Sequence, residues 1–139
     1  MKEIVMKKII VITLLSFYLS SFGMLNTPRY EKIPSRSLRK SFHSALKKVH
    51  HDPNAARRGF LHVEQKALRE DNRHWAANAR IVIGVLRLYK SPFNLVAFED
   101  ILTHFLLARK LANDDPEINF LSEILITYTV AHYESMTKK

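Results

Sequence analysis

The chain contains no cysteine and only three glycines among its 139 residues. Without cysteine it can form neither a disulfide nor a thiolate metal site, so its apolar core has to stabilise the fold. With so few glycines it also lacks the glycine-rich loops that bind nucleotide phosphates and the Gly-x-Ser-x-Gly turn of many hydrolases. No catalytic motif remains, and we therefore expect a protein that is not an enzyme.

Charge is absent from residues 9–28, a run of 20 residues that follows three lysines. A basic head, an apolar middle and small residues behind it are typical of a secretory signal peptide. Ser21 and Gly23 have the small side chains that signal peptidase requires, so we predict a signal peptide over residues 1–23 with cleavage after Gly23. Removing 23 of the 139 residues leaves 116, which is enough for one domain.

An uncleaved membrane anchor is the alternative for this segment. A membrane-spanning helix needs about 20 apolar residues, which is the length of the uncharged run 9–28. Basic residues follow closely, and positive charge at the end of an apolar segment favours keeping that end in the cytoplasm. The sequence therefore predicts an exported protein, periplasmic or secreted, with membrane anchoring by residues 9–28 as the alternative.

Acidic residues are scarce in the next part of the chain. From Met24 to Arg58 nine basic residues are opposed only by Glu31 and Asp52, whereas ten basic and ten acidic residues balance from Gly59 onward. This asymmetry favours a surface for an anionic partner, and a cationic face that only aids solubility is the alternative. The candidate residues are Arg36, Arg39, Lys40, Lys47, Lys48, Arg57 and Arg58.

Strand-like alternation is absent, and signals for the ends of helices take its place. An N-capping residue stands directly before a proline three times, and proline suits the first helical position. These pairs are Asp52-Pro53, Ser91-Pro92 and Asp115-Pro116. Ser35 marks a further helix start, and residues 70–72 mark a break. We predict one helical domain over residues 35–139, behind a basic linker of residues 24–34.

Apolar residues recur at helical spacing in five segments. The segments cover about residues 35–50, 53–69, 72–90, 92–111 and 116–135. The third is apolar on nearly all sides, which is typical of a central helix, and Gly59 in the second indicates a close helix contact. Because the connections are short, neighbouring helices should be antiparallel. We predict an all-α fold of helical hairpins, either a short α-solenoid or a bundle.

The stretch 105–111 and the Asp114-Asp115-Pro116 turn resemble the end of a tetratricopeptide repeat, with an aromatic residue, an alanine three later, a leucine and an Asp-Pro turn. Residues 47–53 are similar to a lesser degree. Trp75 departs from the pattern, because the expected Leu-Gly pair does not follow it. The resemblance covers about a third of the chain. It implies peptide or protein binding in a groove, which we expect on residues 53–111, and it supplies no catalytic residue.

Histidines offer a candidate metal site. His43, His50 and His51 lie close in the sequence, and neutral imidazole binds zinc or copper. No His-Glu-x-x-His pattern supports them, and His50 and His51 stand at a predicted helix C-terminus, where the helix dipole favours a partly cationic ring. His104 and His132 fall on apolar stripes, so we predict that they are buried or at the edge of the core. We expect no cofactor.

The sequence as a whole predicts a non-catalytic exported interaction or adaptor module that binds a protein or peptide in the cell envelope. One alternative is a membrane-tethered helical domain whose basic end binds anionic lipid or another polyanion. The other is a small histidine-based metal-binding protein. We expect neither a nucleic-acid partner, since an exported chain without a DNA-binding motif rarely meets one, nor a small-molecule substrate.

Overall fold

The computed structural model describes residues 33–90 and 93–138. They form the helices α2 (Arg36–Lys47), α3 (Pro53–Arg69), α4 (Arg73–Tyr89), α5 (Leu95–Leu111) and α6 (Pro116–Thr137). The described residues contain no strand, so the all-α prediction is confirmed for them. The predicted signal peptide with its cleavage site at Gly23, the alternative anchor and linker residues 24–32 lie outside these ranges.

Side chains that accept hydrogen bonds from backbone amides cap the helix starts. Ser35 Oγ accepts from Leu38 N at 3.1 Å, and the Asp52 and Asp115 carboxylates cap α3 and α6 in the same way. The predicted start at Ser91-Pro92 is wrong. Asn94 caps α5 instead, with its Oδ1 accepting from Ala97 N at 2.9 Å. The backbone hydrogen bonds of the helix also begin there, since Phe98 N donates to Asn94 O at 2.8 Å.

The end of α2 differs from the prediction, whereas the break between α3 and α4 matches it, and both have local causes. α2 ends at Lys47, before the predicted end at residue 50, because the amides of Lys48 and Val49 bond to carbonyls three residues back and tighten the chain into a turn. The break between α3 and α4 is confirmed. Asp71 has a φ of 55°, a left-handed conformation that ends the helix, and Asn72 then caps α4.

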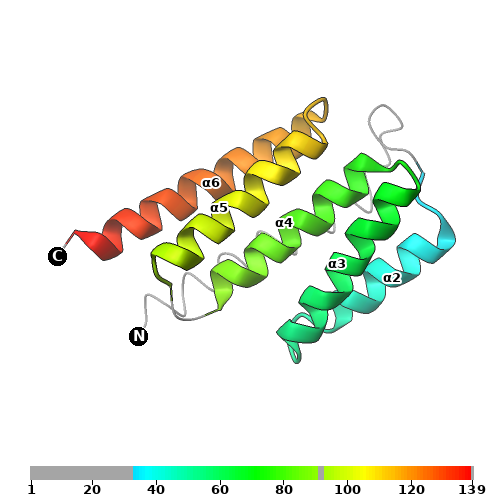
Figure 1. Cartoon of the computed structure of the whole chain (residues 1–139), viewed down its shortest axis with the longest axis horizontal. Helices are drawn as coiled ribbons and strands as arrows, with labels where there is room; N and C mark the ends of the chain where they lie inside the picture. The colour runs from blue at the N-terminus through cyan, green and yellow to red at the C-terminus, as the bar shows by residue number, and fades with distance from the viewer. Residues whose placement is uncertain (1–32, 91–92, 139) are drawn as a thin grey trace.

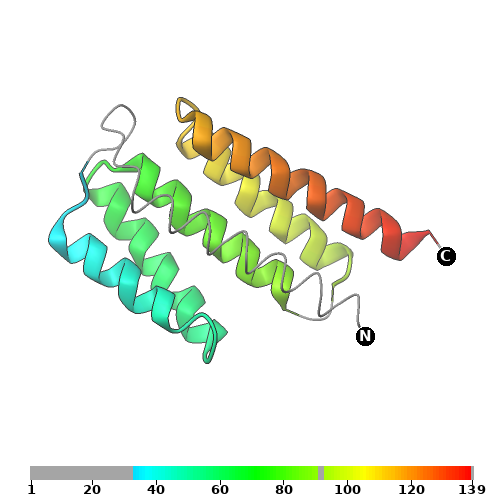
Figure 2. The same cartoon turned by 180° about the vertical axis from the view of Figure 1, so that it is seen from behind.

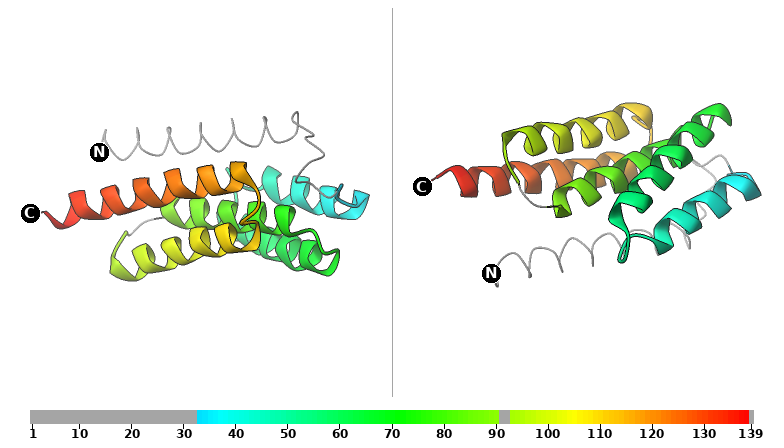
Figure 3. Two further views of the ribbon diagram at one scale, coloured as in Figure 1. Left: turned by 90° about the horizontal axis from the view of Figure 1, so that it is seen from above. Right: turned by 60° about the horizontal axis from the view of Figure 1, so that its bottom comes forward.

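The helices lie side by side in chain order, with α2 and α6 at opposite edges and each helix antiparallel to the next (Figure 1). From behind, α4 again runs through the middle (Figure 2). α6 packs against both α5 and α4, whereas α2 packs on α3 (Figure 3). The predicted antiparallel hairpins are confirmed for the described residues. Solenoids and bundles both contain such hairpins, so the tetratricopeptide resemblance remains a prediction.

The core has two parts that share α4. In the first, Phe42 of α2 meets Phe60 and Trp75 edge to face, with ring centroids 5.3 and 5.0 Å apart. In the second, Ile101 and Phe105 of α5 pack with residues of α4 and α6. α4 is buried on nearly every side, as predicted for the central helix.

Two glycines allow the helices to approach closely. A Cβ on Gly59 would lie 2.8 Å from Ala45 Cβ in α2, which confirms the predicted helix contact. A Cβ on Gly84 of α4 would lie 2.6 Å from Phe105 Cε1 in α5. Real carbon atoms do not pack at these distances, so each glycine sets the separation of a helix pair.

Gly84→Ala should therefore destabilise the protein. Alanine favours a helix over glycine by about 1 kcal/mol, but crowding a packed core costs about 1–3 kcal/mol, and the fully buried Phe105 ring has little room to move. Urea unfolding should show a lower free energy of unfolding for Gly84→Ala. Adding Phe105→Leu should recover part of the loss, and a stabilised Gly84→Ala variant would contradict the close contact.

Candidate anion-binding surface

The charged residues of α2 are all basic, and they share one face. The helix contains no aspartate or glutamate, and Arg36, Arg39, Lys40 and Lys47 recur at spacings of three, four or seven residues. Such spacings place side chains on one face of a helix, and here this face lies opposite the buried Leu38 and its neighbours. We call these four residues the α2 stripe.

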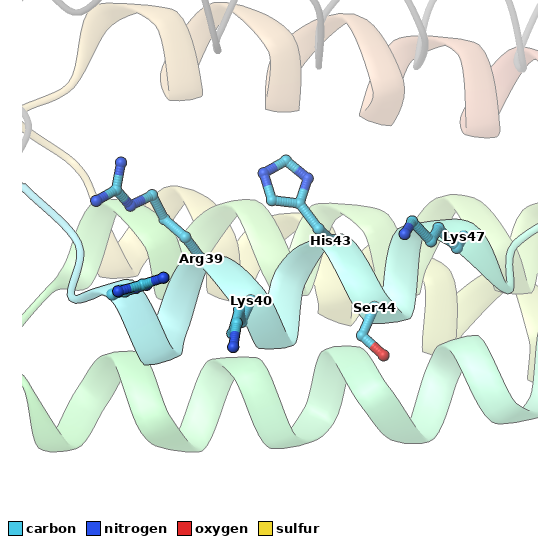
Figure 4. A pocket seen from close by; sticks show the side chains of 6 residues that line it. Arg39, Lys40, His43, Ser44 and Lys47 are labelled. Atoms are coloured by element: carbon cyan, nitrogen blue, oxygen red, sulfur yellow. The ribbon is translucent and has the colours of Figure 1, made fainter.

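The α2 stripe lines a hollow of about 420 Å³ together with His43 and Ser44. Arg39 and His43 project to one side of the helix axis, and Lys40 and Ser44 project to the other (Figure 4). Among the lining residues that the structure describes, four are cationic and none is a carboxylate, so they create a positive field. Such a field attracts anions.

Three predicted members of the anionic-partner surface lie elsewhere. Lys48, Arg57 and Arg58 are exposed, but they are not among the residues that line the hollow. Lys48 follows α2 as its C-cap, and the two arginines belong to α3. The structure therefore brings four of the seven predicted residues together. The hollow also lies on α2, not on residues 53–111 where the sequence predicts a groove.

Polar contacts along one edge of α2 hold the helix against α3. The Glu70 carboxylate accepts from Ser35 N at 3.2 Å and from Ser35 Oγ at 2.7 Å. The Lys66 ammonium donates to Ser37 Oγ and, at 3.5 Å, to Ser41 Oγ. These contacts restrain rotation of α2, so its buried side stays on α3 and the α2 stripe faces outward.

The candidate metal ligands do not form a ligand set. His43 is exposed on α2, and His50 and His51 are exposed in the turn that precedes α3. Within residues 33–90 and 93–138, no three His, Asp or Glu side chains come together in a way that could hold a metal ion. His43 instead contributes to the hollow beside the α2 stripe.

A partly buried polar network, which the sequence did not predict, connects α3, α4 and α5. The Arg80 guanidinium of α4 donates to both carboxylate oxygens of Glu64 on α3. Its Nη1 also lies 3.1 Å from His104 Nδ1 on α5, and His104 Nε2 lies 3.5 Å from Asp100 Oδ2. The available signal was the position of Glu64, four residues after Phe60 on the inward face of α3.

The network determines the protonation of His104. A guanidinium can only donate, so His104 Nδ1 accepts and the ring proton sits on Nε2, facing Asp100. Burial lowers the pKa of His104, and the charges of Arg80 and Arg57 lower it further, while Asp100 opposes them. The ring is therefore neutral, and its predicted place at the core is confirmed by its exposed fraction of 7%.

Protein stability should accordingly fall as the pH falls. In the unfolded chain, histidine takes up a proton near pH 6.5, whereas the lowered pKa of the buried His104 keeps it neutral in the folded chain. Below that pH the unfolded chain therefore binds more protons than the folded one. The slope contributed by one such group is at most about 1.4 kcal/mol per pH unit. Urea unfolding between about pH 7.5 and 5 should show this decline, and His104→Gln should make it shallower. If stability depends on pH equally in the wild type and in His104→Gln, the buried neutral His104 does not cause the decline.

In comparisons with known proteins, no family model, curated protein or solved structure matches this chain. Within the described part of the chain, no helix is both long and apolar enough to cross a membrane. A functional proposal therefore depends on the geometry of the α2 stripe and on the sequence.

Proposed function

We propose that this protein is a non-catalytic helical binding module whose α2 stripe binds an acidic segment of a partner protein in the cell envelope. The observation that carries the proposal is the hollow on α2, where four of the described lining residues are cationic and none is a carboxylate. Export to the envelope is the part of the proposal that rests on the sequence of residues 1–28.

The dimensions and chemistry of the stripe suit a short acidic peptide. Arg36 and Lys47 are eleven residues apart, which corresponds to about 16 Å along a helix. An extended peptide of about five residues spans that distance. Arg36 and Arg39 offer planar guanidinium groups, which can donate two parallel hydrogen bonds to one carboxylate.

Binding of a labelled polyglutamate peptide, followed by fluorescence anisotropy, tests this proposal. Reversing two charges with Arg39→Glu and Lys40→Glu should weaken binding by about tenfold or more, since like charges would then oppose the peptide. Raising the salt concentration from about 50 to 300 mM should also weaken binding by the wild-type protein, because the contacts are exposed.

Arg109→Glu with Lys110→Glu is the matched control. These exposed residues of α5 undergo the same change in net charge away from α2, so this variant should bind the peptide like the wild type. Equal binding by the α2 variant and the control, or no binding by the wild-type protein, would refute the proposal.

Anionic lipid is the second candidate partner, and one observation favours it. The α2 stripe begins at Arg36, eight residues after the uncharged run ends at Pro28. If that run stays in a membrane, the stripe lies close to the headgroups, where basic residues bind anionic lipid. Sedimentation with phosphatidylglycerol vesicles, compared with phosphatidylcholine vesicles, tests this. Binding to the anionic vesicles but not to polyglutamate would replace the first proposal with this one.

A further inference from the structure

The outer face of α6 is the acidic counterpart of the α2 stripe. α6 contains three glutamates and no lysine or arginine. Glu123 and Glu134 are exposed on the side opposite the buried Ile118. On the same side, Phe120 is 67% exposed and Ile124 is 40% exposed. We call Phe120, Glu123, Ile124 and Glu134 the α6 face.

The charges on the two helices have matching spacing. Glu123 and Glu134 are eleven residues apart, as are Arg36 and Lys47, so each pair spans about 16 Å. Two helices packed side by side at this register bring Arg36 and Lys47 each opposite one of the two carboxylates. The long stems of arginine and lysine can also cover the exposed Phe120 ring, and a guanidinium over an aromatic face is attracted to it.

We propose that the α2 stripe of one molecule docks on the α6 face of a second copy of this chain. The two surfaces lie at opposite edges of the helix array (Figure 1), so they meet between molecules and not within one. A docked pair still presents one free α2 stripe and one free α6 face. Association is therefore head to tail and continues into a ring or a filament.

This inference rests on the proposed function, because it identifies the acidic protein segment as α6 of another copy. The contacts are exposed ion pairs, each of which contributes little and is screened by salt. Association should therefore be weak, dependent on concentration and strongest at low ionic strength.

Sedimentation velocity of the full chain over a range of concentrations tests the docking. The wild-type protein should sediment faster as its concentration rises at low salt. Reversal of either face alone, by Arg36→Glu with Lys47→Glu or by Glu123→Lys with Glu134→Lys, should abolish this increase. The chain with all four changes should again sediment faster at higher concentration, because the exchanged residues on α2 and α6 again have opposite charges.

Mixing the two singly reversed chains provides a sharper test. Neither reversed chain should associate by itself, but the mixture should, because the reversed α2 of the first chain meets the reversed α6 of the second. The unchanged acidic α6 of the first chain likewise meets the unchanged basic α2 of the second, so the assembly should contain both chains in equal amounts. The control with Arg109→Glu and Lys110→Glu should associate like the wild type, and circular dichroism should show that all variants keep their helices.

Three results would overturn the inference: a wild-type chain that stays monomeric at low salt, reversed chains that associate as well as the wild type, or a fourfold variant that stays monomeric although it is helical. A monomeric wild-type protein that still binds polyglutamate through α2 would refute self-association and leave the proposed function intact. Failure of both assays would refute both.

Discussion

Arg80→Met should lower the free energy of unfolding by about 3–5 kcal/mol, the cost of breaking a buried ion pair by removing one partner. Arg80 donates to both carboxylate oxygens of Glu64, which is only 7% exposed. Methionine fills a similar volume without charge, so Glu64 is left buried without its guanidinium and His104 loses its donor. Urea unfolding at neutral pH measures the loss.

A double variant separates the cost of leaving Glu64 unpaired from the cost of changing the packing at Arg80. Glu64→Leu combined with Arg80→Met removes both charges, so no buried ion is left unpaired and most of the lost stability should return. Arg58→Met, at an exposed position of α3, should change stability by no more than about 0.5 kcal/mol. If Arg80→Met unfolds at the same urea concentration as the wild type, the pair does not stabilise this fold.

Asp115→Ala should lower the free energy of unfolding by about 2–4 kcal/mol, because it removes an N-cap and a buried contact together. Asp115 is 2% exposed, and its Oδ1 accepts from Glu117 N at 2.9 Å and from Ile118 N at 3.4 Å at the start of α6. Its Oδ2 contacts His74 Nδ1 at the start of α4. Burial lowers the pKa of His74, and the Asp115 carboxylate opposes that shift. Urea unfolding measures the loss.

Asp52→Ala is the matched control, since Asp52 also caps a helix before a proline but is exposed. Only the cap is lost there, so the cost should be about 1 kcal/mol. Asp115→Asn should fall between Asp115→Ala and the wild type, because asparagine keeps the cap and removes the charge beside His74. If Asp52→Ala and Asp115→Ala lower the free energy of unfolding equally, the contact between Asp115 and His74 does not stabilise the fold.

Much of the helical layout could be predicted because the signals act over a few residues. Ser35, Asp52 and Asp115 each accept from an amide two or three residues ahead, so the sequence alone indicates where α2, α3 and α6 begin. The apolar character of α4 on nearly all sides likewise predicted its central place. The start of α5 was mispredicted because two capping signals stand three residues apart, Ser91 and Asn94, and the folded chain uses Asn94.

The candidate site was predicted to the extent that it lies on one helix. Arg36, Arg39, Lys40 and Lys47 share a face of α2 through helical spacing alone. Whether Arg57 and Arg58 join them depends on how α2 packs against α3, through the buried core between the two helices and the polar contacts at its edge. Spacing within the chain carries no information about such a packing angle.

The sequence by itself determined the helices, their buried faces and the cationic side of α2, because caps and periodicity depend on neighbours within about one helical turn. Only the tertiary structure decided that Glu64 meets Arg80, that Arg80 meets His104, and that the basic and acidic helices lie at opposite edges. Those pairs are 16 and 24 residues apart along the chain. Many partners are possible at such separations, and the packing of the helices selects one.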